Sequence, residues 1–166
     1  MIRNKNVTLL RVLLAAVLAL TAMPKAHAES LIVEAESFSK RGGWMVDQQF
    51  MDIMGSPYLI AHGMGVPVSD AVTTVDIGSG GTYHVYVRTY NWTSPWSAKP
   101  GAGAFQLSVG GKRLHTVGQT GNRWQWQKAG TVRLKAGKTR LRLHDLTGFD
   151  GRCAAILLTT DGSLVP

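Results

Sequence analysis

The segment that decides the fold is residues 82–96, TYHVYVRTYNWTSPW. Apolar side chains occupy every second position from Tyr83 to Val87, with polar or larger residues between them. A period of two residues predicts a β-strand that buries one face against a core. The alternation then stops, and Trp92 and Trp96 follow within a short polar segment. The segment therefore predicts a strand that runs into an aromatic loop.

The loop is a candidate binding element because loops on a rigid sheet commonly carry function. Trp92 and Trp96 stand beside Asn91, Ser94 and Pro95, which are typical loop residues. Exposed indoles would suit the flat apolar faces of sugar rings. The alternative is that both tryptophans cap the core.

The remaining chain consists of short apolar or alternating segments that glycine-containing turns separate. No stretch of ten or more residues after the N-terminal segment has apolar spacing at 3.6 residues. This pattern predicts a single all-β domain, either a sandwich or a barrel. The expected strands lie at residues 31–36, 44–50, 71–77, 82–90, 104–109, 112–117, 124–128, 131–134, 139–146 and 153–160, and residues 56–65 contain a further short apolar piece between glycines.

The N-terminus, residues 1–28, has the three parts of a secretory signal peptide. A basic start precedes the apolar run VLLAAVLALTAM at 12–23, and Ala26-His27-Ala28 forms a small-residue cleavage site. A membrane anchor is the alternative, but this run is shorter than the roughly 20 residues that a spanning helix needs. We expect an exported protein, extracellular or periplasmic, whose single domain comprises residues 29–166.

Net charge argues against a nucleic-acid partner once the signal peptide is removed. The whole chain has 18 basic and 10 acidic residues, a net charge of +8. Cleavage removes four of the basic residues and no acidic one, which leaves a net charge of +4. The remaining cations are spread over 112–142, as on a solvated sheet face. The lone Cys153 excludes an internal disulfide.

Motifs for the common catalytic sites are missing from the sequence. It contains no G-x-S-x-G, no H-E-x-x-H and no phosphate-binding G-x-x-x-x-G-K-[ST]. Asp145 and Asp150 are close in sequence and could pair as the acid and base of a glycan hydrolase. A short loop with two aspartates is more often a turn, so both interpretations stay open.

Glu34 and Glu36 form a candidate cation site in the first expected strand. Residues i and i+2 share one face of a strand, so the two carboxylates would point the same way. Like charges side by side are unfavourable without a compensating cation, and calcium prefers oxygen ligands of this kind. Solvent exposure of the two carboxylates, or an arginine beside them, would relieve their repulsion equally well.

The order of several motifs resembles carbohydrate-binding modules of families 6 and 35. The motifs are Glu34-Ala35-Glu36, then G-x-Y-x-V-x-V-R at 81–88, then Ala-Gly before T-x-L-x-L at 139–143, then a closing apolar strand. The segments GGWMVDQQF, GSPYLIAHGMG and DLTGFDGRC resemble a subgroup appended to secreted bacterial glycan-active enzymes and flavin-dependent oxidoreductases. The resemblance implies a galactose-binding-like jelly-roll β-sandwich, a structural calcium ion and a sugar site in the loops at one end.

The metal site departs from the family pattern at Ala154. In the family, the closing strand usually carries an Asp two residues before an Ile, and here Ala154 precedes Ile156. Glu34 and Glu36 carry over as ligands, whereas the third carboxylate does not. Because ligand charge tunes calcium affinity, we expect a weakened site.

The sequence therefore predicts a secreted, non-catalytic carbohydrate-binding module that is monomeric and binds a polysaccharide or glycan. Two alternatives remain: a protein-interaction or structural β-sandwich module of a larger secreted enzyme, which would use the aromatic patch against a partner protein or partner enzyme, and a hydrolase or lyase that acts through Asp145 and Asp150. The expected site residues are the stacking pair Trp92 and Trp96, and the hydrogen-bonding residues Arg88, Asn91, Asp145, Asp150 and Arg152.

Overall fold

The computed structural model describes residues 28–96 and 101–166, so the expected signal peptide lies outside the described residues except for Ala28. Almost all regular structure in these residues is β-strand. The short exceptions are the 3₁₀ turn η1 (Ala35–Ser37) and the single helical turn α2 (Met51–Met54). The strands are β1 (Ser30–Glu34), β2 (Met45–Asp47), β3 (Tyr58–His62), β4 (Ala71–Ile77), β5 (Gly81–Thr89), β6 (Phe105–Val109), β7 (Lys112–Val117), β8 (Gln125–Leu134), β9 (Gly137–Asp145), β10 (Phe149–Cys153) and β11 (Ala155–Thr159).

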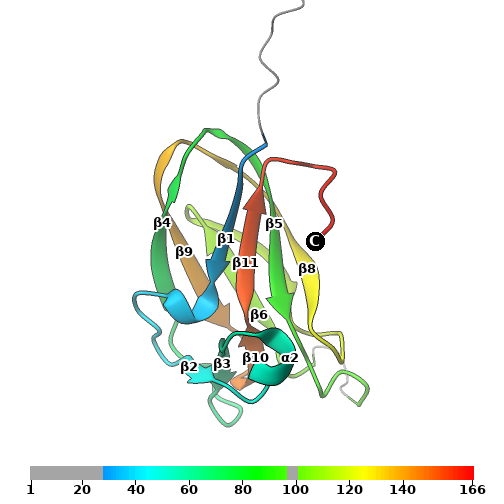
Figure 1. The fold of residues 1–166 in the computed structure, drawn as a ribbon. Coiled ribbons are helices and arrows are strands. Elements are labelled where there is room, and N and C mark those ends of the chain that lie inside the picture. Colours follow the sequence, from blue (N-terminus) through cyan, green and yellow to red (C-terminus); the bar gives the residue numbers. More distant parts are fainter. Residues whose placement is uncertain (1–27, 97–100) are drawn as a thin grey trace, which may run out of the picture.

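Two four-stranded antiparallel sheets form the sandwich (Figure 1). One sheet has the order β1-β11-β5-β8, and the other has the order β4-β9-β6-β7. Apolar side chains from the inner faces of both sheets pack into one core cluster. The predicted jelly-roll β-sandwich is confirmed.

The alternating residues of β5 point to opposite faces of the sheet, as a period of two predicts. Tyr83, Val85 and Val87 are completely buried on the inner face of β5. Tyr86, on the opposite face, is buried as well, and its hydroxyl donates to the carbonyl of Leu164. The C-terminal segment thus packs against part of the outer face of β5, which a simple alternation cannot reveal.

Two strand boundaries differ from the expectation. The Ala129-Gly130 pair was expected to be a turn, but it lies inside the continuous strand β8, where Ala129 is the extra residue of a bulge opposite β5. The expected closing strand at 153–160 is two strands that Ala154 separates. By contrast, the predicted hairpin between β6 and β7 is present, with Gly110 and Gly111 both at positive φ.

A small third sheet closes one end of the sandwich. Its order is β10-β3-β2, and Figure 1 shows these strands and α2 at the lower end of the molecule. The segment expected as one strand at 44–50 is shorter, because β2 ends at Asp47 and the chain turns into α2. No helix in the described residues is long and apolar enough to cross a membrane.

Candidate functional site

A cleft with both polar and apolar lining residues opens on the three-stranded end sheet. The register places Arg152 of β10 opposite Ile60 of β3, and Ile60 opposite Met45 of β2. Side chains opposite one another in neighbouring strands share a face, so these three form a row across the sheet. The cleft has a volume of 370 Å³, and it is lined by Met45, Val46, Asp47, Gln49, Ile60, His62, Asp150 and Arg152.

Asp150 enters the cleft because the strand is bulged at that point. The pairing of β10 with β3 shifts register between Phe149 and Gly151, and Asp150 is the extra residue. Its φ of 59° is left-handed, a conformation that Asp tolerates better than most non-glycine residues. Bulges commonly redirect one side chain at the edge of a sheet. Here the bulge turns a carboxylate toward the aromatic loop.

Asp150 is 5% exposed, and its carboxylate lies close to three other side chains. Trp92 Nε1 donates to Oδ2 over 2.6 Å, and His62 Nδ1 lies 3.1 Å from Oδ1. The Arg152 guanidinium lies 3.9 Å from Oδ2 and also donates to the Asp150 backbone carbonyl over 3.3 Å. Asp150 thus connects the aromatic loop to the cleft.

Arg152 is a buried cation with unused hydrogen-bonding capacity. It is 4% exposed, its Nε has no hydrogen-bond partner, and its guanidinium lies 5.7 Å from the centroid of the Tyr90 ring. A buried donor without a partner is costly, so such an atom commonly meets a water or a ligand. Its place in the cleft lining makes Arg152 the clearest polar anchor there.

Asp47 completes the polar lining on the other side of the cleft. Burial alone would raise the pKa of Asp47, but hydrogen bonds from Tyr58 Oη and the Gln49 backbone N–H outweigh burial and lower the pKa. Those two bonds are 2.7 and 2.9 Å long. Burial and the bond to Asp47 in turn raise the pKa of Tyr58. Asp47 is therefore an ionised acceptor at neutral pH.

The aromatic loop exposes its two indoles. Trp92 is 43% exposed and Trp96 is 77% exposed, and their ring centroids lie 6.3 Å apart at an angle of 61°. Asn91, between them and β5, is completely buried. Its Nδ2 donates to the carbonyls of Ala102 and Gly118, and its Oδ1 accepts from the N–H and hydroxyl of Thr93. Asn91 therefore holds the loop in place and has no free atom for a ligand.

Asp145 has a similar supporting role. It is 1% exposed, and its carboxylate accepts hydrogen bonds from the backbone N–H groups of Val68, Thr147 and Gly148. These bonds join the end of β9 to two loops. Asp145 thus bonds backbone N–H groups of loops, whereas Asp150 contacts Trp92, His62 and Arg152. This arrangement does not support an acid–base pair between the two aspartates.

Arg88 lies on β5 and lines a second hollow beside the cleft. This hollow has a volume of 330 Å³, and its lining is Phe50, Ile53, Arg88, Tyr90, Asn122, Arg123 and Trp124. Trp124 packs edge-on against Tyr58, with ring centroids 4.9 Å apart, so it belongs mainly to a small aromatic cluster. The structure thus separates the predicted site residues into an exposed pair, a buried polar group, two loop supports and Arg88, which lines the second hollow.

Sequence reasoning missed several residues of the cleft. His62, Asp47 and Gln49 line it, and Tyr90 lies beneath the Arg152 guanidinium. No sequence motif includes His62, because its partner Asp150 is 88 positions away in the chain. Asp47 and Gln49 could have been found from the GGWMVDQQF segment, which contains both and was already recognised as a family-like motif.

The two glutamates of the candidate cation site do not share a strand. β1 ends at Glu34, and Glu36 belongs to η1, which corrects the expected strand alternation. Burial raises the pKa of Glu36 and the charge of Glu34 raises it further, so the carboxylates are still close enough to interact. Glu36 Oε2 is buried without a hydrogen-bond partner, which fits a cation ligand.

The third position of this site supplies no side-chain oxygen. Ala154 is buried, its N–H donates to the Arg88 carbonyl, and its own carbonyl accepts from Ala35. Among the described residues, no group of three or more His, Cys, Asp or Glu side chains could hold a metal ion. The residues therefore fit a two-carboxylate site and not a full carboxylate cage.

Comparisons with known proteins identify the fold. No family model matches the sequence, and no curated protein matches it. A family 35 carbohydrate-binding module from Clostridium thermocellum has a TM-score of 0.60 at 19% identity, over 78% of this chain and 97% of that one. The C-terminal family 6 module of a laminarinase from Zobellia galactanivorans has a TM-score of 0.57 at 18% identity, over 80% of this chain and 100% of that one.

The same fold also occurs as part of a larger enzyme. A β-(1,4)-mannanase with a family 35 module from Podospora anserina has a TM-score of 0.60 at 19% identity. The match covers 82% of this chain but only 29% of that enzyme. This chain therefore has the fold of family 35 and family 6 carbohydrate-binding modules, as the sequence resemblance implied.

Proposed function

We propose that this chain is an exported, non-catalytic carbohydrate-binding module whose site is the end-sheet cleft together with the aromatic loop. The observation that carries the proposal is the contact between Trp92 and Asp150. An exposed indole is tied directly to the buried carboxylate that organises Arg152 and His62. An aromatic face beside a few convergent polar groups is the usual composition of a small-ligand site.

Each part of the arrangement has a role in this proposal. Trp96 and the free face of Trp92 stack on sugar rings. Arg152 binds hydroxyl or acidic groups within the cleft, and the Asp47 carboxylate accepts hydrogen bonds from sugar hydroxyls. Asp150 holds both parts in register, since a ligand that spans the cleft and the loop needs a fixed distance between them.

Export and calcium belong to the same proposal. The N-terminal signal pattern supports export, and the buried free oxygen of Glu36 supports weak calcium binding beside Glu34. Calcium bound there would join η1 to β1 and stabilise the fold, with no part in sugar binding.

The test is a glycan array followed by titration of the tightest ligand against cleft variants. Gln49→Ala removes an exposed side chain that lines the cleft, and Gln48→Ala is the matched control one position away. We expect Gln49→Ala to weaken binding severalfold and Gln48→Ala to leave it unchanged. Equal affinity of both variants and the parent protein would place the site elsewhere. Turnover of the bound glycan would argue for an enzyme instead.

A further inference from the structure

A second charged surface lies away from the cleft, on the outer face of the sheet β4-β9-β6-β7. Alternation along β9 points Lys138, Arg140 and Arg142 outward, because Thr139, Leu141 and Leu143 are buried. The register then places Arg142 opposite Ser108 of β6, and Ser108 opposite Arg113 of β7. We call the surface that contains Lys40, Arg113, Arg140 and Arg142 the basic face.

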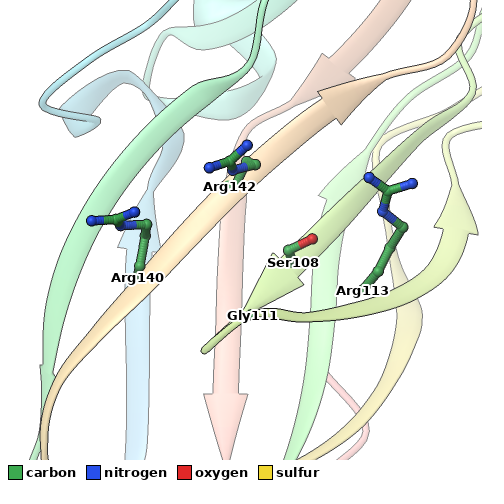
Figure 2. A pocket seen from close by; sticks show the side chains of 5 residues that line it. All are labelled: Ser108, Gly111, Arg113, Arg140 and Arg142. Atoms are coloured by element: carbon green, nitrogen blue, oxygen red, sulfur yellow. The ribbon is translucent and has the colours of Figure 1, made fainter.

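The basic face is hollowed by two adjoining depressions. The first, of 530 Å³, is lined by Ser108, Gly111, Arg113, Arg140 and Arg142, and Figure 2 shows Ser108 between Arg113 and the two arginines of β9. The second, of 380 Å³, is lined by Ser39, Lys40, Val72, Thr73, Thr74, Arg140 and Arg142. Because both contain Arg140 and Arg142, they form one continuous track across β9.

Most of the positive charge on this track is uncompensated. Arg142 pairs with Asp70 over 3.0 Å, and Asp70 also meets His144 over 2.8 Å. Within residues 28–96 and 101–166, no ion pair involves Lys40, Arg113 or Arg140. Like charges on neighbouring positions of a sheet face are unfavourable unless an anion lies between them. The face is therefore complementary to a ligand with several negative charges.

We propose that the basic face binds an anionic polysaccharide, one that carries carboxylate or sulfate groups at regular intervals. Arg140 and Arg142 are two residues apart on one strand, a separation of about 7 Å. Arg142 and Arg113 are two strands apart, a separation of about 10 Å. A glycan with an anionic group on every sugar, or on every second sugar, presents charges at comparable intervals. Guanidinium groups bind carboxylate and sulfate oxygens in paired hydrogen bonds.

The lining favours a polysaccharide over a single-stranded nucleic acid. None of the residues that line the two depressions is aromatic, so bases would have no stacking platform. Instead, the Ser108 hydroxyl lies between Arg113 and the arginines of β9, and Ser39 and Thr74 line the second depression, where their hydroxyls can bond sugar hydroxyls. This site goes beyond the proposed function, because it uses another sheet and none of the cleft residues.

The experiment measures binding of the full chain to polygalacturonate, to heparin and to a neutral glycan, by calorimetry at several salt concentrations. The double variant Arg113→Gln/Arg140→Gln removes two unpaired cations. The matched control Arg133→Gln/Lys135→Gln removes the same charge at exposed positions in and after β8, on the other sheet. We expect the first variant to weaken binding of a polyanion roughly tenfold or more. It should also lower the salt slope by about 2, one for each lost contact.

The two glycans distinguish carboxylate from sulfate recognition, and arginine-dependent binding of either one supports the site. Equal losses in both double variants would overturn it, because net charge would then explain the binding. Tighter binding of duplex DNA than of either polyanion, or no binding to any polyanion at about 50 mM salt, would overturn it as well. Trp92→Ala should leave polyanion binding intact, so failure here and failure of the cleft proposal are distinguishable.

Discussion

The indole Nε1 of Trp92 donates a 2.6 Å hydrogen bond to the carboxylate of Asp150, although 58 positions separate the two residues in the sequence. The bond joins the loop after β5 to the bulge in β10. It fixes one indole at the edge of the cleft and leaves the neighbouring Trp96 as its exposed extension. The two tryptophans should therefore respond differently to mutation.

Trp96→Ala should lose glycan affinity without losing stability. Because Trp96 is 77% exposed, its removal should change the free energy of unfolding by less than about 0.5 kcal/mol. Loss of an aromatic anchor should cost about 2 kcal/mol of binding. Thermal melting and glycan titration measure the two effects. Trp124→Ala is the packing control, and it should lower the free energy of unfolding more than Trp96→Ala does, because its partly buried ring packs against Tyr58. Full affinity of Trp96→Ala would contradict the aromatic site.

Trp92→Phe should lose part of the stability and part of the glycan affinity of the parent protein. The ring remains available for stacking, but the hydrogen bond to Asp150 is gone. An unmade bond to a buried charged group costs about 1.5–3 kcal/mol, which we expect as a lower free energy of unfolding. Urea unfolding beside Trp96→Phe, which has no such bond to lose in the described structure, isolates the effect. Equal stabilities would mean that the loop does not depend on this bond.

Asp150→Asn should destabilise the fold through Arg152. Asn tolerates the left-handed conformation at this position, so the backbone is preserved. However, the buried Arg152 guanidinium loses its neighbouring negative charge, which should cost about 3 kcal/mol. The double variant Asp150→Asn/Arg152→Met should recover part of that loss. Asp76→Asn, in an exposed pair with Lys138, should change stability little. A double variant less stable than Asp150→Asn would refute the explanation.

Calcium should raise the melting temperature of this protein only slightly. Glu34 and Glu36 supply two carboxylates, and Ala154 supplies none. A ligand that binds only the native state stabilises it by about 2.7 kcal/mol at a hundredfold excess over Kd, and less when binding is weak. Ala154→Asp should lower stability in chelator and enlarge the calcium shift. A large shift of the parent protein that chelator abolishes would show an intact site.

Glu36 should make stability depend on pH in the acidic range. Its pKa is raised in the folded state, mainly by burial and then by Glu34. Its contribution to stability is therefore fully present below its ordinary pKa of 4.5 and is lost as pH rises through the folded value. In chelator, Glu36→Gln should be at least as stable as the parent at pH 7, and relatively less stable near pH 4. Parallel stability curves for the two proteins would contradict this.

The sequence by itself determined the fold class. Alternation from Tyr83 to Val87, with short apolar segments between glycine turns, predicts an all-β sandwich or barrel, and the family resemblance implied the sandwich. Two indoles in a polar loop also predicted correctly that Trp92 and Trp96 are exposed. These are local properties, because period and composition act within a few residues.

Only the tertiary structure decided which polar residues meet. Asn91 and Asp145 looked like site residues because they lie in loops, yet each uses its side chain to satisfy buried backbone groups, as loops that cross a sandwich require. His62 and Asp47 join the cleft through strand register, which depends on pairing between distant segments. The bulge that turns Asp150 toward Trp92 exists only when β10 pairs with β3, so no local pattern could reveal it.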